Sequence, residues 1–293
     1  MLSAGAAKIL YKSDMNTNLL AGGAPTPKGL VDPAAAARRI RLATYPPAAA
    51  LLGVVDYFWV VEWDLRGRAA QTQRVLPYPN AHLVFERGRS ALHGVVKGAY
   101  ERTLEGRGRV FGVRFKPGAL RPFIDTPLAR LTDRTMALDT LDALLPCGGA
   151  EAERRVLDQD DDGAMVAAAQ ALLLLAAPPA PDPRAILAER AVGAAAAEHG
   201  PTSVAALCAA LAVDERFLQR LFSNYVGVSP KWVIQRFRLQ EAMWRLGRCE
   251  TVDLAALSGR LGFFDQAHFT RNFSKLVGHS PLDYWKSQTA ALA

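Results

Sequence analysis

Residues 41–140 alternate short apolar runs with clusters of Gly, Pro, Asn and Arg. Apolar runs of this length, bounded by turn-forming residues, are typical of β-strands. The runs are VVDYFWVVEW, RVLPYP, AHLVFE, ALHGVVKGAY and GRVFGVRFKPG. We therefore expect a β-rich domain over residues 41–140, with structure beginning near Tyr45. Residues 1–40 are rich in Ala, Gly and Pro and have no sustained period, which predicts a flexible arm.

After residue 140 the pattern becomes helical. Residues 151–177 and 183–199 are rich in Ala and Leu, and the prolines of APPAPDP between them stop one helix and start the next. We expect a helical connector over residues 141–200, whose Leu172–Leu175 run suggests a dimerisation or interdomain contact. Acidic residues in this region predict a solvated helix face and loop. They are Glu151, Glu153, Asp158, Asp160, Asp161 and Asp162.

Residues 201–293 contain an internal repeat. Residues 214–230 (DERFLQRLFSNYVGVSP) align with residues 265–281 (DQAHFTRNFSKLVGHSP) with eight identities in 17 positions. Upstream of this match, the apolar spacing also recurs once the register is slipped by one residue. Self-similarity of this kind indicates one supersecondary unit, here of about 30 residues, present in two copies.

Each copy of the repeat predicts two short helices joined by a tight turn. In the first copy we expect helices over residues 204–211 and 215–225, with Asp214 as the N-cap of the second helix. In the second copy we expect helices over residues 254–260 and 265–277. Two helices in this arrangement form a helix-turn-helix, whose second helix enters the DNA major groove in proteins that bind DNA with it.

A longer helix is expected between the two copies. Pro230 occupies its first turn, as proline often does, and the helical pattern runs to about Leu246. Its apolar residues occupy two sides of the helix, so we expect a spine that holds one helix-turn-helix at each end. Val233, Phe237 and Trp244 form one side, and Leu239, Ala242, Met243 and Leu246 form the other.

The second helix of each copy has an apolar face and a polar face. In the major groove, Arg pairs with guanine, Gln pairs with adenine, and an apolar group such as Ala contacts the thymine methyl. The outward residues that fit this chemistry are Arg216, Gln219, Arg220 and Ser223 in the first copy, and Gln266, Ala267, Thr270 and Arg271 in the second. Lys231 and Lys275 are candidate phosphate contacts, which position a protein without reading sequence.

Composition agrees with a basic, two-domain protein. A chain of 293 residues is long enough for two domains, and its net charge of +7 favours phosphate-bearing partners. Cys147, Cys208 and Cys249 form no C-x-x-C pair, which suggests a reducing compartment. The first 20 residues lack the apolar core of a secretory signal, and the apolar stretch at 164–177 falls short of the ~20 residues that span a bilayer. We expect a cytoplasmic, nucleoid-associated protein without a membrane partner.

The repeat resembles the DNA-binding domain of AraC/XylS-type bacterial transcription regulators. The resemblance covers residues 201–286 and rests on LCAALAVDERFLQRLF, VGVSPKWVIQRFRLQEA and LGFFDQAHFTRNFSKLVGHSPLDYW. It implies two helix-turn-helix units joined by a long helix, which fill residues 201–293 and bind double-stranded DNA with the outward residues named above. Ala212 replaces the usual turn glycine of the first unit, and Ser258 takes a position usually held by Ala.

Residues 41–140 resemble, more weakly, the N-terminal β domain of one subgroup of that family. The resemblance rests on YPPAAALLGVVDYFWVVEW, LPYPNAHLVFE and VFGVRFKPGALRPF. It implies an α+β chain, in which a β-rich and in some relatives cupin-like regulatory or dimerisation domain precedes a helical connector and the all-α double helix-turn-helix domain. A small-molecule effector, a homodimer and RNA polymerase stay open as further partners.

Other classes of site have weaker signals. His82, Glu86 and His93 are residue types of a cupin metal site, but the close H-x-H pair is absent, so we expect no metal. The aromatic residues at 57–63 could line a ligand pocket, although their density on one strand favours a core. The sequence has no cysteine cluster, P-loop or G-x-S-x-G, so we expect no enzyme, no catalytic residue and no cofactor. A pure interaction module is disfavoured because the outward helix faces are polar.

Overall fold

The computed structural model describes residues 17–19, 25–27, 40–176, 182–248 and 251–290. Most of the expected flexible arm at 1–40 lies outside these residues. Within it, strands β1 (Thr17–Leu19) and β2 (Pro25–Pro27) pair in an antiparallel manner.

The N-terminal part is built on a six-stranded antiparallel sheet with strand order β10-β7-β6-β9-β4-β3. Strands β5 and β8 pair separately as a two-stranded ribbon. The bounds are β3 (Ile40–Tyr45), β4 (Val55–Asp64), β5 (Gln71–Val75), β6 (His82–Phe85), β7 (Ala91–His93), β8 (Tyr100–Leu104), β9 (Arg107–Phe115) and β10 (Thr135–Ala137). The expected β-rich domain is therefore confirmed.

The six-stranded sheet begins earlier than expected, because β3 starts at Ile40 and not near Tyr45. The sequence IRLATY is too short and too mixed to predict a strand by itself. It becomes one because all six residues pair with β4, from Ile40 opposite Trp63 to Tyr45 opposite Phe58. Residues 40–45 therefore form a strand because of their pairing with β4, and not because of their local sequence pattern.

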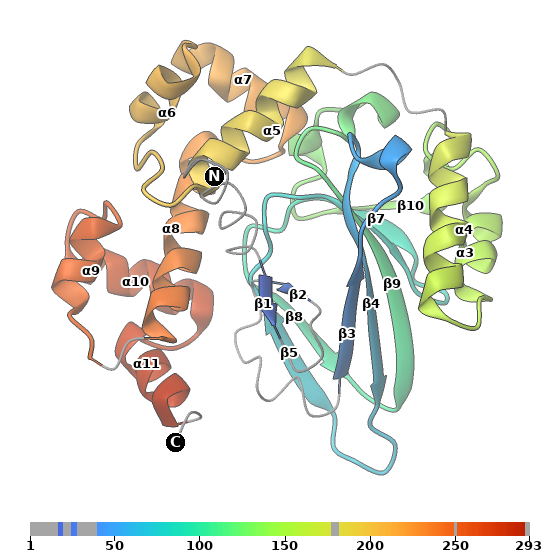
Figure 1. Cartoon of the computed structure of the whole chain (residues 1–293), viewed down its shortest axis with the longest axis horizontal. Coiled ribbons are helices and arrows are strands. Elements are labelled where there is room, and N and C mark those ends of the chain that lie inside the picture. The colour runs from blue at the N-terminus through green and yellow to red at the C-terminus, as the bar shows by residue number, and fades with distance from the viewer. Residues whose placement is uncertain (1–16, 20–24, 28–39, 177–181, 249–250, 291–293) are drawn as a thin grey trace, which may run out of the picture.

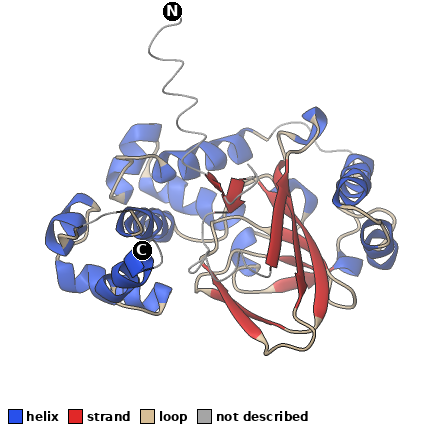
Figure 2. Ribbon diagram, turned by 60° about the horizontal axis from the view of Figure 1, so that its bottom comes forward, coloured by secondary structure: helices blue, strands red, loops and turns tan. Residues whose placement is uncertain are grey.

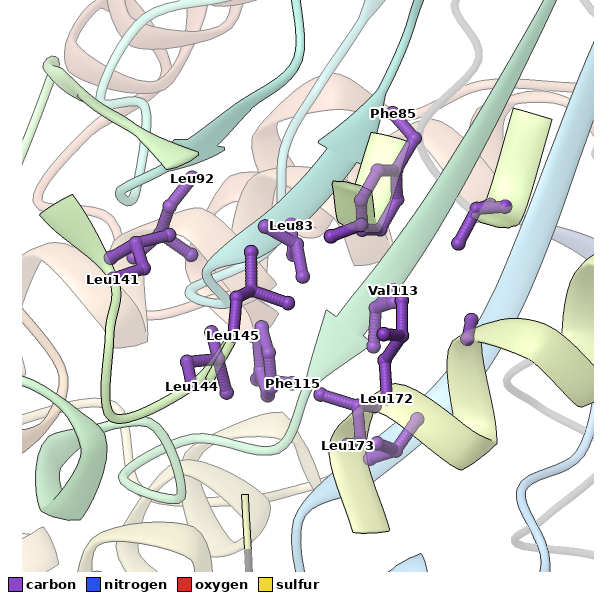
Figure 3. Close-up of a cluster of buried hydrophobic side chains, with 14 of the residues drawn as sticks. Leu83, Phe85, Leu92, Val113, Phe115, Leu141, Leu144, Leu145, Leu172 and Leu173 are labelled. Carbon is purple, nitrogen blue, oxygen red and sulfur yellow. The ribbon is translucent and has the colours of Figure 1, made fainter. Parts of the chain in front are cut away.

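One face of the sheet is covered by helices α3 (Gly149–Leu157) and α4 (Asp162–Leu175). Alternating strand residues such as Leu83, Phe85, Val113 and Phe115 belong to the same buried cluster as Leu172 and Leu173 of α4 (Figure 3). The C-terminal helices lie on the other side of the sheet from α3 and α4 (Figures 1 and 2). The sheet is thus the central layer of the molecule.

The helical segment expected at 151–177 consists of the two helices α3 and α4, separated at residues 158–161. Asp161 caps α4, because its carboxylate accepts a hydrogen bond from the Ala164 N–H at 2.8 Å. Asp162 is not a solvated acid as expected, since it pairs with Arg41 and with the Tyr45 hydroxyl, each at 2.6 Å. The acidic run therefore separates α3 from α4, and Asp162 attaches the start of α4 to the sheet through Arg41 and Tyr45.

The Leu172–Leu175 run divides between core and surface. Leu172 and Leu173 are buried against the sheet, whereas Leu174 and Leu175 are exposed. The first two leucines therefore belong to the core of the β domain, which leaves only the last two for a contact with another molecule.

The expected connector at 141–200 does not pack as one unit. Helices α3 and α4 join the core of the sheet, whereas α5 (Pro183–Ala196) packs against the C-terminal helices α7 and α8. The C-terminal helices are α6 (Val204–Leu211), α7 (Glu215–Tyr225), α8 (Pro230–Leu246), α9 (Leu254–Arg260), α10 (Gln266–Val277) and α11 (Pro281–Ala290). Helices α6 to α10 match the predicted ones to within one residue. No helix in the described parts of the chain has the length and apolar character needed to cross a membrane.

Candidate nucleic-acid interface

In the first helix-turn-helix unit, α6 and α7 are joined at Ala212 and Val213. Ala212 adopts the left-handed conformation, with φ of 54°. The Asp214 carboxylate accepts a hydrogen bond from the Phe217 N–H at 2.8 Å and so caps α7, as predicted. The cap and the left-handed residue together set the angle between the two helices.

The second unit repeats this local geometry in α9 and α10. Gly262 takes the left-handed conformation, with φ of 73°, and a Cβ there would meet Thr202 Cβ at 2.7 Å. The Asp265 carboxylate accepts from the His268 N–H at 2.6 Å and caps α10. The repeat found in the sequence is therefore also a repeat of structure.

The predicted reading faces of α7 and α10 point away from the core. Leu218, Leu221 and Phe222 are buried under α7, and Phe269, Phe273 and Leu276 under α10. The outward residues Arg216, Gln219, Arg220, Ser223, Gln266, Ala267 and Arg271 are exposed, and Thr270 is half-buried. The exposed residues of α7 also line an open hollow made by Glu215, Arg216, Gln219 and Arg220.

The charged groups of these faces are available to a partner. Within the described part of the chain, neither Arg220 nor Arg271 forms an ion pair. Lys231 and Lys275 are exposed beside the same helices, Lys231 in the first turn of α8 and Lys275 in the last turn of α10. The structure thus places all ten predicted residues on or next to two matching helices, while their contacts with DNA stay a prediction.

Helix α8 links the units as the expected spine, but its faces differ from the prediction. Trp244, expected on an apolar side, is 40% exposed and is covered by the Arg248 guanidinium at 4.5 Å from its ring. Arg236 and Arg238 are instead buried. Arg238 donates to the Ala195 carbonyl of α5 at 2.9 Å and pairs with Glu241 at 2.6 Å.

Arg236 ties α8 to the N-terminal domain. Its side chain is 3% exposed and donates hydrogen bonds to the carbonyls of Pro77 at 3.2 Å, Gly98 at 3.4 Å and Lys97. The guanidinium also stacks on the Trp232 ring at 4.5 Å. Burial lowers the pKa of Arg236 to about 10, so the side chain remains charged at neutral pH. Carbonyl dipoles therefore compensate a buried cation at this interface.

The loop after β5 inserts beside the spine. Leu76 packs into the core of the second unit, and Tyr78 packs on Phe237 of α8 with ring centroids 5.7 Å apart. Tyr78 in turn stacks on Arg114 of β9 at 4.6 Å. The sheet is therefore in continuous contact with α8 through Arg114 and Tyr78.

The N-terminal domain also touches the C-terminal end of α7 and of α10. Beyond α7, the Gly227 carbonyl accepts a hydrogen bond from the Thr132 hydroxyl at 2.5 Å. Beyond α10, Gly278 has a φ of 91°, which favours glycine, and lies against the guanidinium of Arg74 in β5. A cation at a helix C-terminus is favoured by the helix dipole. The two glycines of the repeated Val-Gly-x-Ser-Pro sequence are therefore both interdomain contacts.

Sequence reasoning missed these interdomain residues. Arg236 lies in an ordinary basic stretch, and Thr132 and Arg74 lie in loops or strands without a motif. Their contacts are with residues far away in the sequence, so no local signal marks them. The Val-Gly-x-Ser-Pro sequence, repeated at residues 226–230 and 277–281, is visible in the chain, but it indicates only where the helices end and gives no sign of an interdomain contact.

His82 and Glu86 have side-chain partners within the β domain, and His93 lies opposite His82 on the neighbouring strand β7. His82 Nδ1 accepts a hydrogen bond from Trp59 Nε1 at 3.2 Å, and Glu86 pairs with Arg102 at 2.5 Å. Burial, with the nearby Arg114 charge, lowers the pKa of His82 to about 3. Burial also lowers the pKa of His93. Both imidazoles are therefore neutral around pH 7.

Family models match two parts of the chain. Residues 43–137 match a model described as "Domain of unknown function (DUF6597)", and residues 207–287 match one described as "Helix-turn-helix domain". The chain has no match among curated proteins.

The chain also resembles several solved structures. One is a transcriptional regulator from Chromobacterium violaceum described as AraC-type, at 23% identity and a TM-score of 0.30, over 33% of this chain and 88% of that one. Another is ToxT from Vibrio cholerae O395, at 10% identity and a TM-score of 0.35, over 86% of this chain and 99% of that one. A third is ToxT from Vibrio cholerae strain SCE256 with a bound unsaturated fatty acid, at 9% identity and a TM-score of 0.32, over 84% and 91%.

The helix-turn-helix match at 207–287 covers both capped units and the spine between them. It agrees with the resemblance carried by the repeated sequence motifs. The chain accordingly contains a helix-turn-helix domain at residues 207–287, preceded at residues 43–137 by a domain of unknown function.

Proposed function

We propose that this chain is an AraC-type transcription regulator, which reads double-stranded DNA by inserting α7 and α10 into successive major grooves on one side of the duplex. The observation that carries the proposal is the pair of matching, exposed polar faces on two helices attached to one spine. Helix-turn-helix units that bind one face of DNA are separated by about one helical turn, ~34 Å. A continuous α8 favours such a fixed separation.

The proposed roles follow the chemistry of each side chain. Arg216, Gln219 and Arg220 of α7 would hydrogen-bond to base edges, as would Gln266 and Arg271 of α10. Ser223 and Thr270 can donate to or accept from either a base or a phosphate. Ala267 would contact a thymine methyl, and Lys231 and Lys275 would contact phosphates.

We also propose that the N-terminal domain controls this reading. Support comes from its contacts with α8 through Arg236 and with the ends of α7 and α10 through Thr132 and Arg74. An effector that shifted the loop carrying Tyr78 would act on the spine directly, because Tyr78 packs on Phe237. A homodimer and a contact with RNA polymerase stay predictions.

Site selection on random DNA tests the proposed reading. The full chain should enrich a site with two conserved blocks. Arg220→Ala and Arg271→Ala should each cost about 1 to 3 kcal/mol of binding free energy and relax preference at one base pair, in different blocks. Arg68→Ala removes the same charge from an exposed position between β4 and β5. It should leave the base preference unchanged. Retention of every base preference in both reading-face variants would overturn the assignment.

A further inference from the structure

The turn of the second helix-turn-helix unit contains one residue more than that of the first. Left-handed Ala212 corresponds to left-handed Gly262, and Val213 corresponds to Phe263. In the first unit the N-cap Asp214 follows Val213 directly, whereas in the second Phe264 precedes the N-cap Asp265. The one-residue slip between the repeats is therefore located at Phe264.

Phe264 does not pack against its own unit. A hydrophobic residue just before an N-cap commonly packs on the fourth residue of the helix, which here is Phe269. That contact is made by Phe263 instead, with ring centroids 5.2 Å apart. Phe264 is left 93% exposed, more than any other exposed large hydrophobic residue in the described part of the chain.

The position of Phe264 restricts what can cover it. It immediately precedes Asp265, which caps α10, and so lies at the end of α10 that carries Gln266 and Ala267. In helix-turn-helix proteins the N-terminal residues of the recognition helix contact base edges. The apolar group that the major groove presents to a protein is the C5-methyl of thymine, which phenylalanine can contact.

We propose that Phe264 is a further specificity-determining residue, which packs on a thymine methyl at the edge of the DNA block read by α10. This inference rests on the proposed function, because it requires α10 to enter the major groove. It gives the second unit an apolar contact that the shorter turn of the first unit does not provide. Ala267, the other apolar residue on this end of α10, would extend the same apolar surface.

Substitution of uracil for thymine tests the contact, since uracil differs only by the missing methyl. In a site selected by the full chain, each thymine of both blocks is replaced in turn, and affinity is measured for wild type and Phe264→Ala. One replacement in the α10 block should weaken wild-type binding about fourfold, as expected for one buried methyl group. Phe264→Ala should bind the thymine site about fourfold more weakly and show no further loss on that replacement.

Control variants separate this contact from others. Phe264→Leu, which keeps an apolar side chain, should retain most of the dependence on the methyl group. Ala267→Gly should alter the response at a different thymine. Replacements in the α7 block should affect wild type and Phe264→Ala equally. Because Phe264 is exposed, the unfolding midpoint of these Phe264 variants should equal that of wild type.

The outcomes distinguish this inference from the proposed function. Absence of any sequence preference in the wild type would overturn both. Sequence-selective binding in which Phe264→Ala responds to every uracil replacement as wild type does would overturn the Phe264 contact alone. Normal DNA recognition by Phe264→Ala with impaired transcription would also overturn it, and would assign the side chain to a protein partner.

Discussion

The two helix-turn-helix units are built from the same pattern but are held differently. The first is enclosed by other elements: the Tyr225 hydroxyl donates to Asp182 at 2.6 Å, and the core around Phe222 includes Tyr78 and Val95 of the β domain. The second packs mainly on the C-terminal helices, where Phe273 meets Tyr284 of α11 with ring centroids 5.7 Å apart. Leu76 is the buried residue that the β domain adds to this second core.

This difference indicates separate roles for two similar units. The first unit is part of the main body of the molecule, through α5 and the β domain. The second is attached through α8, α11 and a few side chains of the β domain. The proposed control by the N-terminal domain would therefore act more directly on the first unit and the spine than on the second unit.

Removing a core ring from each unit should give the largest effects. Phe222→Ala and Phe273→Ala delete fully buried rings at matching positions, and each should cost about 3 to 5 kcal/mol. Phe273→Ala should unfold the second unit first, with exchange protection lost in α10 and kept in α7. Phe222→Ala should destabilise α5, α7 and α8 together. A single transition that includes the whole chain in both variants would contradict the difference between the units.

Cutting the contact between the spine and the β domain should have the next largest effect. Arg236→Met removes charged donors from the carbonyls of Pro77 and Lys97 and should lower the free energy of unfolding by about 1.5 to 3 kcal/mol. Arg245→Met, which removes a less buried pair with Glu241 on the same helix, should cost under about 1 kcal/mol. Urea unfolding measures both. Equal losses would mean that Arg236 contributes no more than a surface pair.

Acid should weaken the β domain, on which the first unit depends. His82 is neutral in the fold because its pKa is depressed, so the unfolded chain binds more protons between about pH 3 and 6.5. The stability due to His82 is therefore complete above pH 6.5 and is lost as pH falls, at about 1.4 kcal/mol per pH unit. Charged Arg114 and the neighbouring His93 oppose protonation of His82.

Urea unfolding at pH 7, 6 and 5 measures this dependence. In His82→Gln the free energy of unfolding should fall less steeply with decreasing pH, by about 1.4 kcal/mol per pH unit. Exchange protection in wild type should fall in α7 before α10, because Arg114 and Tyr78 connect this part of the sheet to the first unit. An unchanged slope in His82→Gln would exclude His82 as the source.

The two turns should give the smallest effects, with opposite signs. Ala212→Gly removes the steric cost of holding an alanine in the left-handed conformation, but it also gives the unfolded chain more conformational entropy. The net result should be a stabilisation of about 0.5 kcal/mol. Gly262→Ala imposes the same conformation and adds a contact with Thr202 Cβ, so it should destabilise by at least about 1 kcal/mol. Thermal unfolding of both variants checks the signs. Equal signs would show that the turns are not equivalent.

The sequence predicted the C-terminal helices well because their ends are set locally. Asp214 and Asp265 cap them, Gly227 and Gly278 follow them, and Pro230 begins the next helix. These signals act within a few residues of the backbone they affect.

Features that depend on packing, and not on local backbone signals, are not predicted by the sequence. Arg236 is buried because carbonyls of the β domain reach it, and β3 forms because β4 pairs with it. Trp244 was placed in a core from apolar spacing, although the adjacent Arg248 covers it at the surface. Phe264 would satisfy a local packing rule, yet Phe263 occupies that contact first. Spacing shows which residues share a face, whereas packing decides which of them are buried.

The central claim is that α7 and α10 read one face of the duplex together. The most direct test is the affinity of the full chain for its selected site after insertion of five base pairs between the two blocks, compared with insertion of ten. Five base pairs rotate one block by about half a turn, and ten restore its direction. The account predicts that the five-base-pair insertion reduces binding to that of a single block. Equal affinity for the original site and the site with the five-base-pair insertion would contradict it.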